Sequence, residues 1–268
     1  VERATRRKVA IKHIIRRTAA DDKFVAQAET EFAVSQAIDH PVLRKCHEIV
    51  RIRKWLKVSE LFLIMEYVEG ETLEQLCPDR MADIVALFIK VADGLNAMHR
   101  AGYAHCDVKP INILLMENHE PKIIDFGQSC ALGTVKERIQ GTPDYIAPEQ
   151  LERKPIDHRT DIYNLGATMY WVVTGKAFAT KMQVAPVGTK KIEVDARRGS
   201  EPPHELNPKV PLALSSLILE CCEEGPEARP RDMKQVIARL EVAQHLSERN
   251  EEKLPRPVRP APDRTEPE

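Results

Sequence analysis

The stretch His105–Asn112 has the sequence HCDVKPIN and decides how the rest of the chain is interpreted. Five residue types at set positions within it (His, Asp, Lys, Pro and Asn) would arise together by chance in about one of ten thousand chains of this length. A second stretch, Asp125–Gly127, has the sequence DFG and begins 13 residues after Asn112. Taken alone, DFG is a common turn after a strand. Its distance from the first stretch makes a purely structural role a poor explanation.

Upstream of these stretches, the chain predicts a sheet with one helix. Alternating and β-branched apolar residues indicate strands at Lys8–Ile15 and Ile49–Trp55. A nearly unbroken apolar run indicates a third strand, buried on both faces, at Leu61–Val68. Apolar residues at helical spacing predict a helix over Asp22–Ile38. The β-rich part ends near Glu69.

Downstream, the pattern changes to helices. Apolar residues recur with a helical period from Ile84 to Met98, and this helix closes near Gly102. The remaining predicted elements are the strands Ile113–Met116 and Lys122–Ile124 and the helices Thr160–Thr174, Leu212–Cys222 and Met233–Leu246. The sequence therefore predicts an α+β protein in which a β-rich part precedes a helical part.

The composition excludes several classes of protein. The 40 basic and 41 acidic residues leave a formal charge of -1, so no overall field attracts nucleic acid or anionic lipid, and we expect neither as a partner. Ile162–Val173, the most apolar stretch, is shorter than the roughly 20 residues that cross a bilayer. The six cysteines show no C-x-x-C spacing, which argues against a zinc or disulfide framework and favours a cytoplasmic location.

The two short stretches together are similar to signature motifs of the protein kinase family. His105–Asn112 resembles the catalytic loop, in which Lys109-Pro110 is typical of the serine/threonine class, and Asp125–Gly127 resembles the metal-binding motif. The resemblance implies a bilobal α+β fold, with a small antiparallel sheet and one helix in the N-lobe and a larger, mainly helical C-lobe. It also implies a serine/threonine kinase that transfers the γ-phosphate of Mg-ATP to hydroxyls of a protein substrate.

The resemblance assigns roles to residues of both stretches. Asp107 is the expected catalytic base, and Lys109 is expected beside the transferring phosphate. Asn112 and Asp125 are the expected Mg²⁺ ligands. Phosphoryl transfer needs little covalent help from the protein, so each role consists of orienting the hydroxyl, holding the phosphate or neutralising charge.

A third stretch, Val9–Lys12 (VAIK), resembles the kinase strand whose lysine contacts the α- and β-phosphates. The partner of Lys12 is expected nine residues before His40-Pro41, which indicates Glu31 and leaves Glu29 as a nearby alternative. The resemblance implies the remaining nucleotide contacts: Met65 as the gatekeeper, backbone groups of Glu66 and Val68, Ala10 and Leu114 on either side of the adenine, and Val1.

Later motifs extend the resemblance along most of the chain. Gly141–Glu149 (GTPDYIAPE) resembles the end of a kinase activation segment, in which Thr142 would bond near the catalytic base. Asp161 corresponds to the family residue that braces the catalytic loop, and Arg229 is expected to pair with Glu149. Both roles are structural rather than catalytic.

The resemblance divides the chain into an N-lobe (residues 1–68), a C-lobe (69–246) and a Pro-rich, disordered linker (247–268). Val1–Ala4 resembles the residues after the third glycine of the kinase phosphate loop, so we expect this N-lobe to lack its first strand and that loop. The linker has two expected continuations: a transmembrane helix, which would make the chain the cytoplasmic domain of a membrane protein, or another cytoplasmic domain.

Two other functions stay open at this point. A pseudokinase that binds ATP or serves as a scaffold would share the fold, although the presence of Lys12, Asp107, Asn112 and Asp125 argues against it. A small-molecule phosphotransferase of related fold is disfavoured by Lys109-Pro110 and by the activation-segment motif, which favour a protein acceptor.

Cys106 stands where many kinases have an arginine that binds a phosphate on the activation segment. Such a phosphate carries about -1.5 to -2 charges and needs a cationic anchor. We therefore predict that activity depends little on phosphorylation of Ser129 or Thr134. Phosphatase treatment is expected to leave transfer to a protein acceptor unchanged, and loss of transfer would contradict the prediction.

Overall fold

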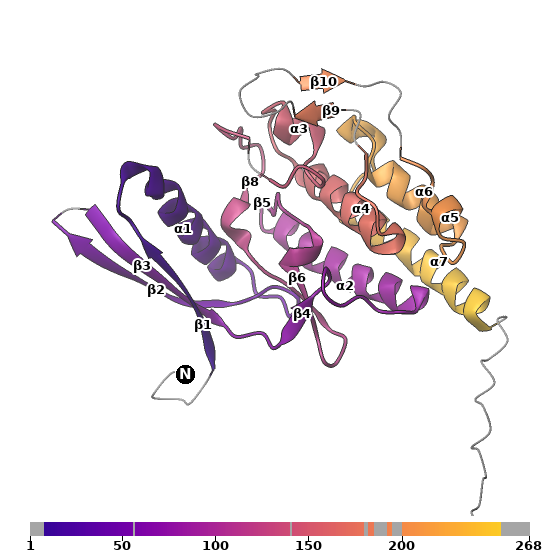
Figure 1. The fold of residues 1–268 in the computed structure, drawn as a ribbon, viewed down its shortest axis with the longest axis horizontal. Helices are drawn as coiled ribbons and strands as arrows, with labels where there is room; N and C mark the ends of the chain where they lie inside the picture. Colours follow the sequence, from indigo (N-terminus) through magenta and orange to yellow (C-terminus); the bar gives the residue numbers. More distant parts are fainter. Residues whose placement is uncertain are drawn as a thin grey trace, which may run out of the picture.

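The N-lobe of the computed structural model is a three-stranded antiparallel sheet covered on one face by a helix (Figure 1). The structure describes residues 8–55, 57–139, 141–179 and 200–252, and the backbone alone at 182–184 and 192–194. The strands β1 (Val9–Ile15), β2 (Cys46–Lys54) and β3 (Lys57–Glu66) lie in the order β1-β3-β2. The helix α1 (Asp22–Ala37) connects β1 to β2 and packs on the sheet.

The central strand β3 is buried on one face only. Leu61, Leu63 and Met65 are fully buried against Val25 and Ala28 of α1. The alternate residues of β3 face away from α1 and are half-buried. The apolar run predicted burial on both faces, which is wrong because α1 covers a single face of the sheet.

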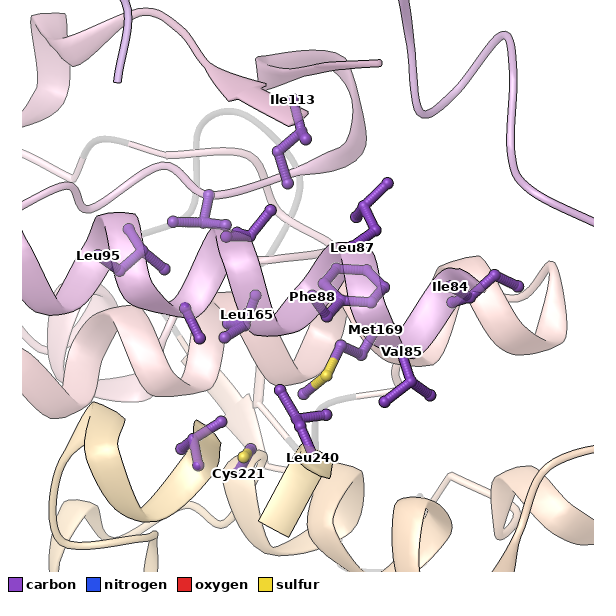
Figure 2. Packing of buried hydrophobic residues seen from close by; sticks show 14 of the residues in the cluster. Ile84, Val85, Leu87, Phe88, Leu95, Ile113, Leu165, Met169, Cys221 and Leu240 are labelled. Atoms are coloured by element: carbon purple, nitrogen blue, oxygen red, sulfur yellow. The ribbon is translucent and has the colours of Figure 1, made fainter. Parts of the chain in front are cut away.

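The C-lobe core is built from four long helices: α2 (Met81–Arg100), α4 (His158–Thr174), α6 (Leu212–Cys221) and α7 (Met233–Glu252). Figure 2 shows apolar side chains from these helices meeting in one core, among them Phe88, Leu95, Met169 and Leu240. The helical period predicted from Ile84 to Met98 is the buried stripe of α2. All five predicted helices are present, with ends shifted by a few residues.

Short strands lie where the two lobes meet. The strands β4 (Gly70–Thr72), β6 (Ile113–Met116) and β7 (Pro121–Ile123) form a sheet in the order β4-β6-β7, and β5 (Tyr103–Ala104) pairs with β8 (Cys130–Ala131). The smaller elements are α3 (Pro148–Leu151), α5 (Pro203–Leu206), β9 (Met182–Val184), β10 (Ile192–Val194) and the 3₁₀ turns η1 (Ala19–Asp21), η2 (Pro110–Asn112), η3 (Phe126–Gln128) and η4 (Pro226–Ala228).

The last helix extends beyond its predicted end. The linker was predicted to begin at residue 247, but α7 continues to Glu252. Ser247 is buried and its hydroxyl donates to the Ala243 carbonyl, while Glu251 forms an ion pair with Arg80 of the α2 N-terminus at 2.8 Å. These contacts explain the extra turn. Residues 253–268, the rest of the predicted linker, lie outside the described residues.

In the described part of the chain, no helix has the length and apolar character needed to cross a membrane. Ile162–Val173, the most apolar stretch of the sequence, lies inside α4 and packs in the C-lobe core.

Leu95 of α2 is fully buried in the C-lobe core, so shortening its side chain should destabilise the fold strongly. We expect Leu95→Ala to lower the free energy of unfolding by about 2–5 kcal/mol, because the lost methyl groups leave a cavity. The control is Val242→Ala on the exposed face of α7, which should change it by less than about 0.5 kcal/mol. Urea unfolding followed by circular dichroism measures both, and equal effects would contradict the assigned packing.

Candidate active site

The backbone of the catalytic loop (His105–Asn112) is braced by one carboxylate from α4. Asp161 is fully buried and accepts hydrogen bonds from the amides of His105 and Cys106, each at 2.8 Å. It also bonds to Nε2 of His99 at 2.8 Å. Burial pushes the pKa of Asp161 upward, but the hydrogen bonds and the nearby histidines outweigh it, so the pKa is lowered. An ionised Asp161 therefore orients the loop.

The loop brings together the expected catalytic base, Asp107, and two residues expected at the phosphate and the metal, Lys109 and Asn112. Nζ of Lys109 lies 2.8 Å from Oδ2 of Asp107. The side-chain amide of Asn112 donates to the Asp107 carbonyl oxygen at 2.9 Å and to its carboxylate at 3.3 Å. Thr142 completes the group, since its hydroxyl accepts from Lys109 at 2.7 Å and donates to Asp107 at 3.5 Å. The activation segment thus contacts the catalytic loop through Thr142.

Lys12 of β1 lies between two carboxylates. Its Nζ is 2.9 Å from Oε2 of Glu31 and 3.5 Å from Oδ1 of Asp125. Burial lowers the pKa of Lys12, but Glu31 and Asp125 outweigh it and raise the pKa. Glu29, the alternative partner, instead binds Arg51 at 2.9 Å. The structure therefore pairs Lys12 with Glu31.

Asp125 lies in a turn that exposes its carboxylate. Its backbone has φ of 63°, a left-handed conformation that aspartate tolerates, and its Oδ1 accepts from the Gly127 amide at 3.2 Å. A Cβ on Gly127 would lie 3.1 Å from that same oxygen, which favours glycine there. Burial raises the pKa of Asp125, but Lys12 and the Gly127 amide outweigh it and lower the pKa. The carboxylate is thus ionised, and the Asp125 side chain is 45% exposed.

The residues expected around adenine lie at the junction of the lobes. Ala10 of β1 is opposite Met65 of β3, which is buried at the end of that strand. Leu114 is half-buried on β6, and Val68 follows the end of β3. Val1 lies outside the described residues. The expected adenine contacts that the structure describes therefore come from β1, β3, β6 and the residues just after β3.

Several supporting residues carry no local motif and were not predicted. Gln150 donates to the Cys106 carbonyl at 2.8 Å, and Thr168 donates to the Val108 carbonyl at 3.1 Å. Lys122 of β7 binds the Glu66 carboxylate at 3.1 Å, which links β7 to the end of β3. The acceptors are backbone carbonyls and a glutamate far away in the sequence. Such acceptors leave no motif around Gln150, Thr168 or Lys122, so the sequence carried little signal for these contacts.

A buried ion pair fixes the end of the activation segment. Arg229 binds Glu149 through two parallel hydrogen bonds of 2.8 and 2.9 Å, and its guanidinium lies 4.9 Å from the centre of the Tyr163 ring. Thr160 donates to the same carboxylate at 2.8 Å. The predicted pair of Glu149 and Arg229 is thus present and anchors α3 to the C-lobe.

The donor set fits a magnesium ion held jointly with phosphates. Asn112 and Asp125 offer oxygen ligands, the type that Mg²⁺ prefers, and Mg²⁺ is usually bound by one or two carboxylates plus substrate phosphates. Among the described residues there is no group of three or more His, Cys, Asp or Glu side chains arranged to hold a metal alone.

Comparison with known proteins agrees with this geometry. The family described as "Protein kinase domain" matches residues 1–240. The chain belongs to the protein kinase family. The chain is 29% identical over 263 residues to a protein named "Probable serine/threonine-protein kinase" of Clostridium acetobutylicum, covering 95% of this chain and 39% of that relative.

Two further relatives of the kinase domain carry similar names. A "Probable serine/threonine-protein kinase" of Clostridium perfringens is 35% identical over 188 residues, covering 67% of this chain and 27% of the relative. Serine/threonine-protein kinase PknB of Mycolicibacterium smegmatis is 28% identical over 247 residues, covering 87% of this chain and 38% of the relative. The chain thus spans less than half the length of these three proteins.

The buried ion pair predicts strong destabilisation of the kinase domain when Arg229 is replaced. We expect Arg229→Met to lower the free energy of unfolding by about 3–5 kcal/mol, because the Glu149 charge stays buried without its partner. The control is Arg239→Met, which breaks the more exposed pair with Glu220 and should cost less than about 1 kcal/mol. Thermal and urea unfolding measure both, and similar losses for the two variants would count against the prediction.

Proposed function

We propose that the chain is an active protein serine/threonine kinase that uses Mg²⁺ and ATP. The observation that carries the proposal is the group formed by Asp107, Lys109 and Thr142, in which a carboxylate, a cation and a hydroxyl converge within hydrogen-bonding distance. Phosphoryl transfer to a hydroxyl requires a proton acceptor and a cation at the same place. The names of the relatives support a serine or threonine acceptor on a protein.

Asp107 is the proposed catalytic base. Its carboxylate is nearly buried, and Lys109 and the Asn112 amide both contact it, so these contacts hold it in one orientation. In this role it accepts the proton of the acceptor hydroxyl as that oxygen bonds to phosphorus. Lys109 then has a second role, which is to offset negative charge on the transferring group.

Lys12, Asn112 and Asp125 are proposed to hold the nucleotide. Lys12 is oriented by the buried Glu31 carboxylate, and a lysine in this setting suits the α- and β-phosphates. Asn112 and Asp125 are the proposed Mg²⁺ ligands, and bound Mg²⁺ neutralises phosphate charge. Adenine is proposed to lie between Ala10 and Leu114, beside Met65 and the backbone of Glu66 and Val68, with Val1 as a further contact.

The cytoplasm is the proposed location of the chain, and another protein is its proposed acceptor. A kinase that takes ATP and keeps six reduced cysteines suits the cytoplasm, and the described cysteines are all free thiols. We propose a serine or threonine of another protein as the acceptor. Whether the kinase domain continues into a membrane helix or another domain is a separate question, which the gene sequence beyond Glu268 answers.

The proposal predicts a loss of transfer from changes in the acceptor group and the nucleotide site. Asp107→Asn is expected to lower kcat by about 10²–10⁴-fold, because the base is lost while the fold remains. Lys12→Met and Asp125→Asn should abolish measurable transfer. The assay is phosphate transfer from Mg-ATP to casein by the chain extended upstream of Val1 with a glycine-rich phosphate loop.

The control is Lys176→Met, an exposed lysine paired with Glu201, which should keep full activity. Circular dichroism and thermal unfolding check that each variant is folded. Folded parent protein that binds ATP without transferring phosphate would favour the pseudokinase alternative instead. Equal activity in the parent and in Asp107→Asn would overturn the role proposed for Asp107.

A further inference from the structure

Two cysteines that are far apart in the sequence lie side by side next to the catalytic base. Sγ of Cys106 is 3.7 Å from Sγ of Cys130. The strands β5 and β8, labelled in Figure 1, bring them together. In their register Ala104 is opposite Cys130. Cys106 precedes Asp107, and Cys130 lies five residues after Asp125. The pair therefore joins the catalytic loop to the start of the activation segment.

The backbone holds Cys106 firmly and leaves Cys130 as the partner that can move. The Cys106 amide donates to Asp161 and its carbonyl accepts from Gln150, both at 2.8 Å. Cys130 belongs to β8, a strand of two residues whose second residue, Ala131, is exposed. A disulfide has an S–S distance of about 2.05 Å, so the sulfurs must approach by roughly 1.7 Å. Rotation of the Cys130 side chain and a small shift of β8 are the expected source of that approach.

The two thiols differ in access and in acidity. Cys106 is buried at 1% exposure in an apolar cluster with Ala104 and Ile156, whereas Cys130 lies partly open at its edge. The hydrogen bond between the two sulfurs lowers the pKa of Cys130, and Lys136 acts in the same direction against the effect of burial. The same bond, with burial, raises the pKa of Cys106. Cys130 is thus suited to attack a small oxidant, and Cys106 to close the bond.

We propose that Cys106 and Cys130 form a peroxide-sensitive pair that closes into a disulfide between the catalytic loop and the activation segment. This inference concerns the thiols alone and does not rest on the proposed kinase activity. The other described cysteines lack these features. Cys46, Cys221 and Cys222 are buried, and burial raises the pKa of Cys46 to about 11 and that of Cys221 to about 12.

The reaction proceeds in two steps with hydrogen peroxide as the oxidant. The Cys130 thiolate attacks one peroxide oxygen, an S–O bond forms, the O–O bond breaks, and the departing hydroxide takes a proton to give water. The Cys106 sulfur then attacks the Cys130 sulfenic acid, an S–S bond forms, and the S–O bond breaks. The departing hydroxide takes the Cys106 thiol proton. Two thiols are oxidised by two electrons, and one peroxide is reduced to two waters.

The disulfide would give the catalytic loop a covalent link to the activation segment. It closes a loop of about 25 residues, a size at which the chain-entropy estimate predicts appreciable stabilisation if the native geometry accepts the bond. Because the hydrogen bonds of Cys106 hold its backbone in place, Asp107 should keep its position when the bond forms. We therefore expect the oxidised protein to be folded and more resistant to heat than the reduced protein.

The test treats the 268-residue chain with stoichiometric hydrogen peroxide, blocks the remaining thiols and maps the peptides by mass spectrometry. The expected product is a Cys106–Cys130 disulfide, reversed by dithiothreitol, with the other four cysteines reduced.

Three variants test the assignment. Cys130→Ser should not form the disulfide. The matched control is Cys77→Ser, which removes another partly exposed thiol whose pKa is raised by burial, and it should form the disulfide at the parent rate. Cys106→Ser should stop at a Cys130 sulfenic acid that dimedone traps.

Thermal unfolding gives a second measurement. Oxidation should raise the apparent midpoint of the parent by about 5 °C and leave that of Cys130→Ser unchanged. A first oxidation product at another cysteine, or over-oxidation of Cys130 without a disulfide, would overturn the proposal. A parent midpoint that stays the same or falls after the bond has formed would also overturn it, because the pair would then close only under strain.

Discussion

The site depends on the buried carboxylate of Asp161. It binds two successive amides at the start of the catalytic loop, where Cys106 has a left-handed backbone with φ of 66°. Without an acceptor these amides would be buried and unpaired, at a cost of about 1–3 kcal/mol each. The carboxylate therefore stabilises a backbone conformation that a side chain on Cys106 makes unfavourable. The positions of Asp107, Lys109 and Asn112 follow from that conformation.

The sequence predicted those parts of the site whose residues lie close together in the chain. The resemblance of His105–Asn112 to the kinase catalytic loop indicated which residues of this one loop belong to the site. The contacts of Asp107 with Lys109 and Asn112 come from the structure. The resemblance to kinases indicated Glu31 through its spacing to His40-Pro41 and left Glu29 as an alternative. The structure decides between them, because Lys12 binds Glu31 whereas Glu29 binds Arg51. The helices of the C-lobe were predicted because their apolar residues follow the helical period over several turns.

Other features could not be predicted because they depend on tertiary contacts. Gln150 and Thr168 support the catalytic loop by donating to its carbonyls, and any polar residue at the right place would do so. The extra turn of α7 exists because Glu251 meets Arg80, a residue 171 positions earlier in the sequence. The proximity of Cys106 to Cys130 depends on a strand pair of two residues, too short to leave a periodic pattern.

Glu31 has a second cation besides Lys12, and this affects how far α1 can move. Its other carboxylate oxygen binds Arg44 at 2.7 Å, and the Arg44 amide donates to the Ile123 carbonyl of β7 at 3.0 Å. An outward swing of α1 would break both ion pairs of this carboxylate. The loss of these two charge-assisted contacts opposes the displaced arrangement. Any inhibitor that needs α1 displaced would have to offset this loss with its own contacts.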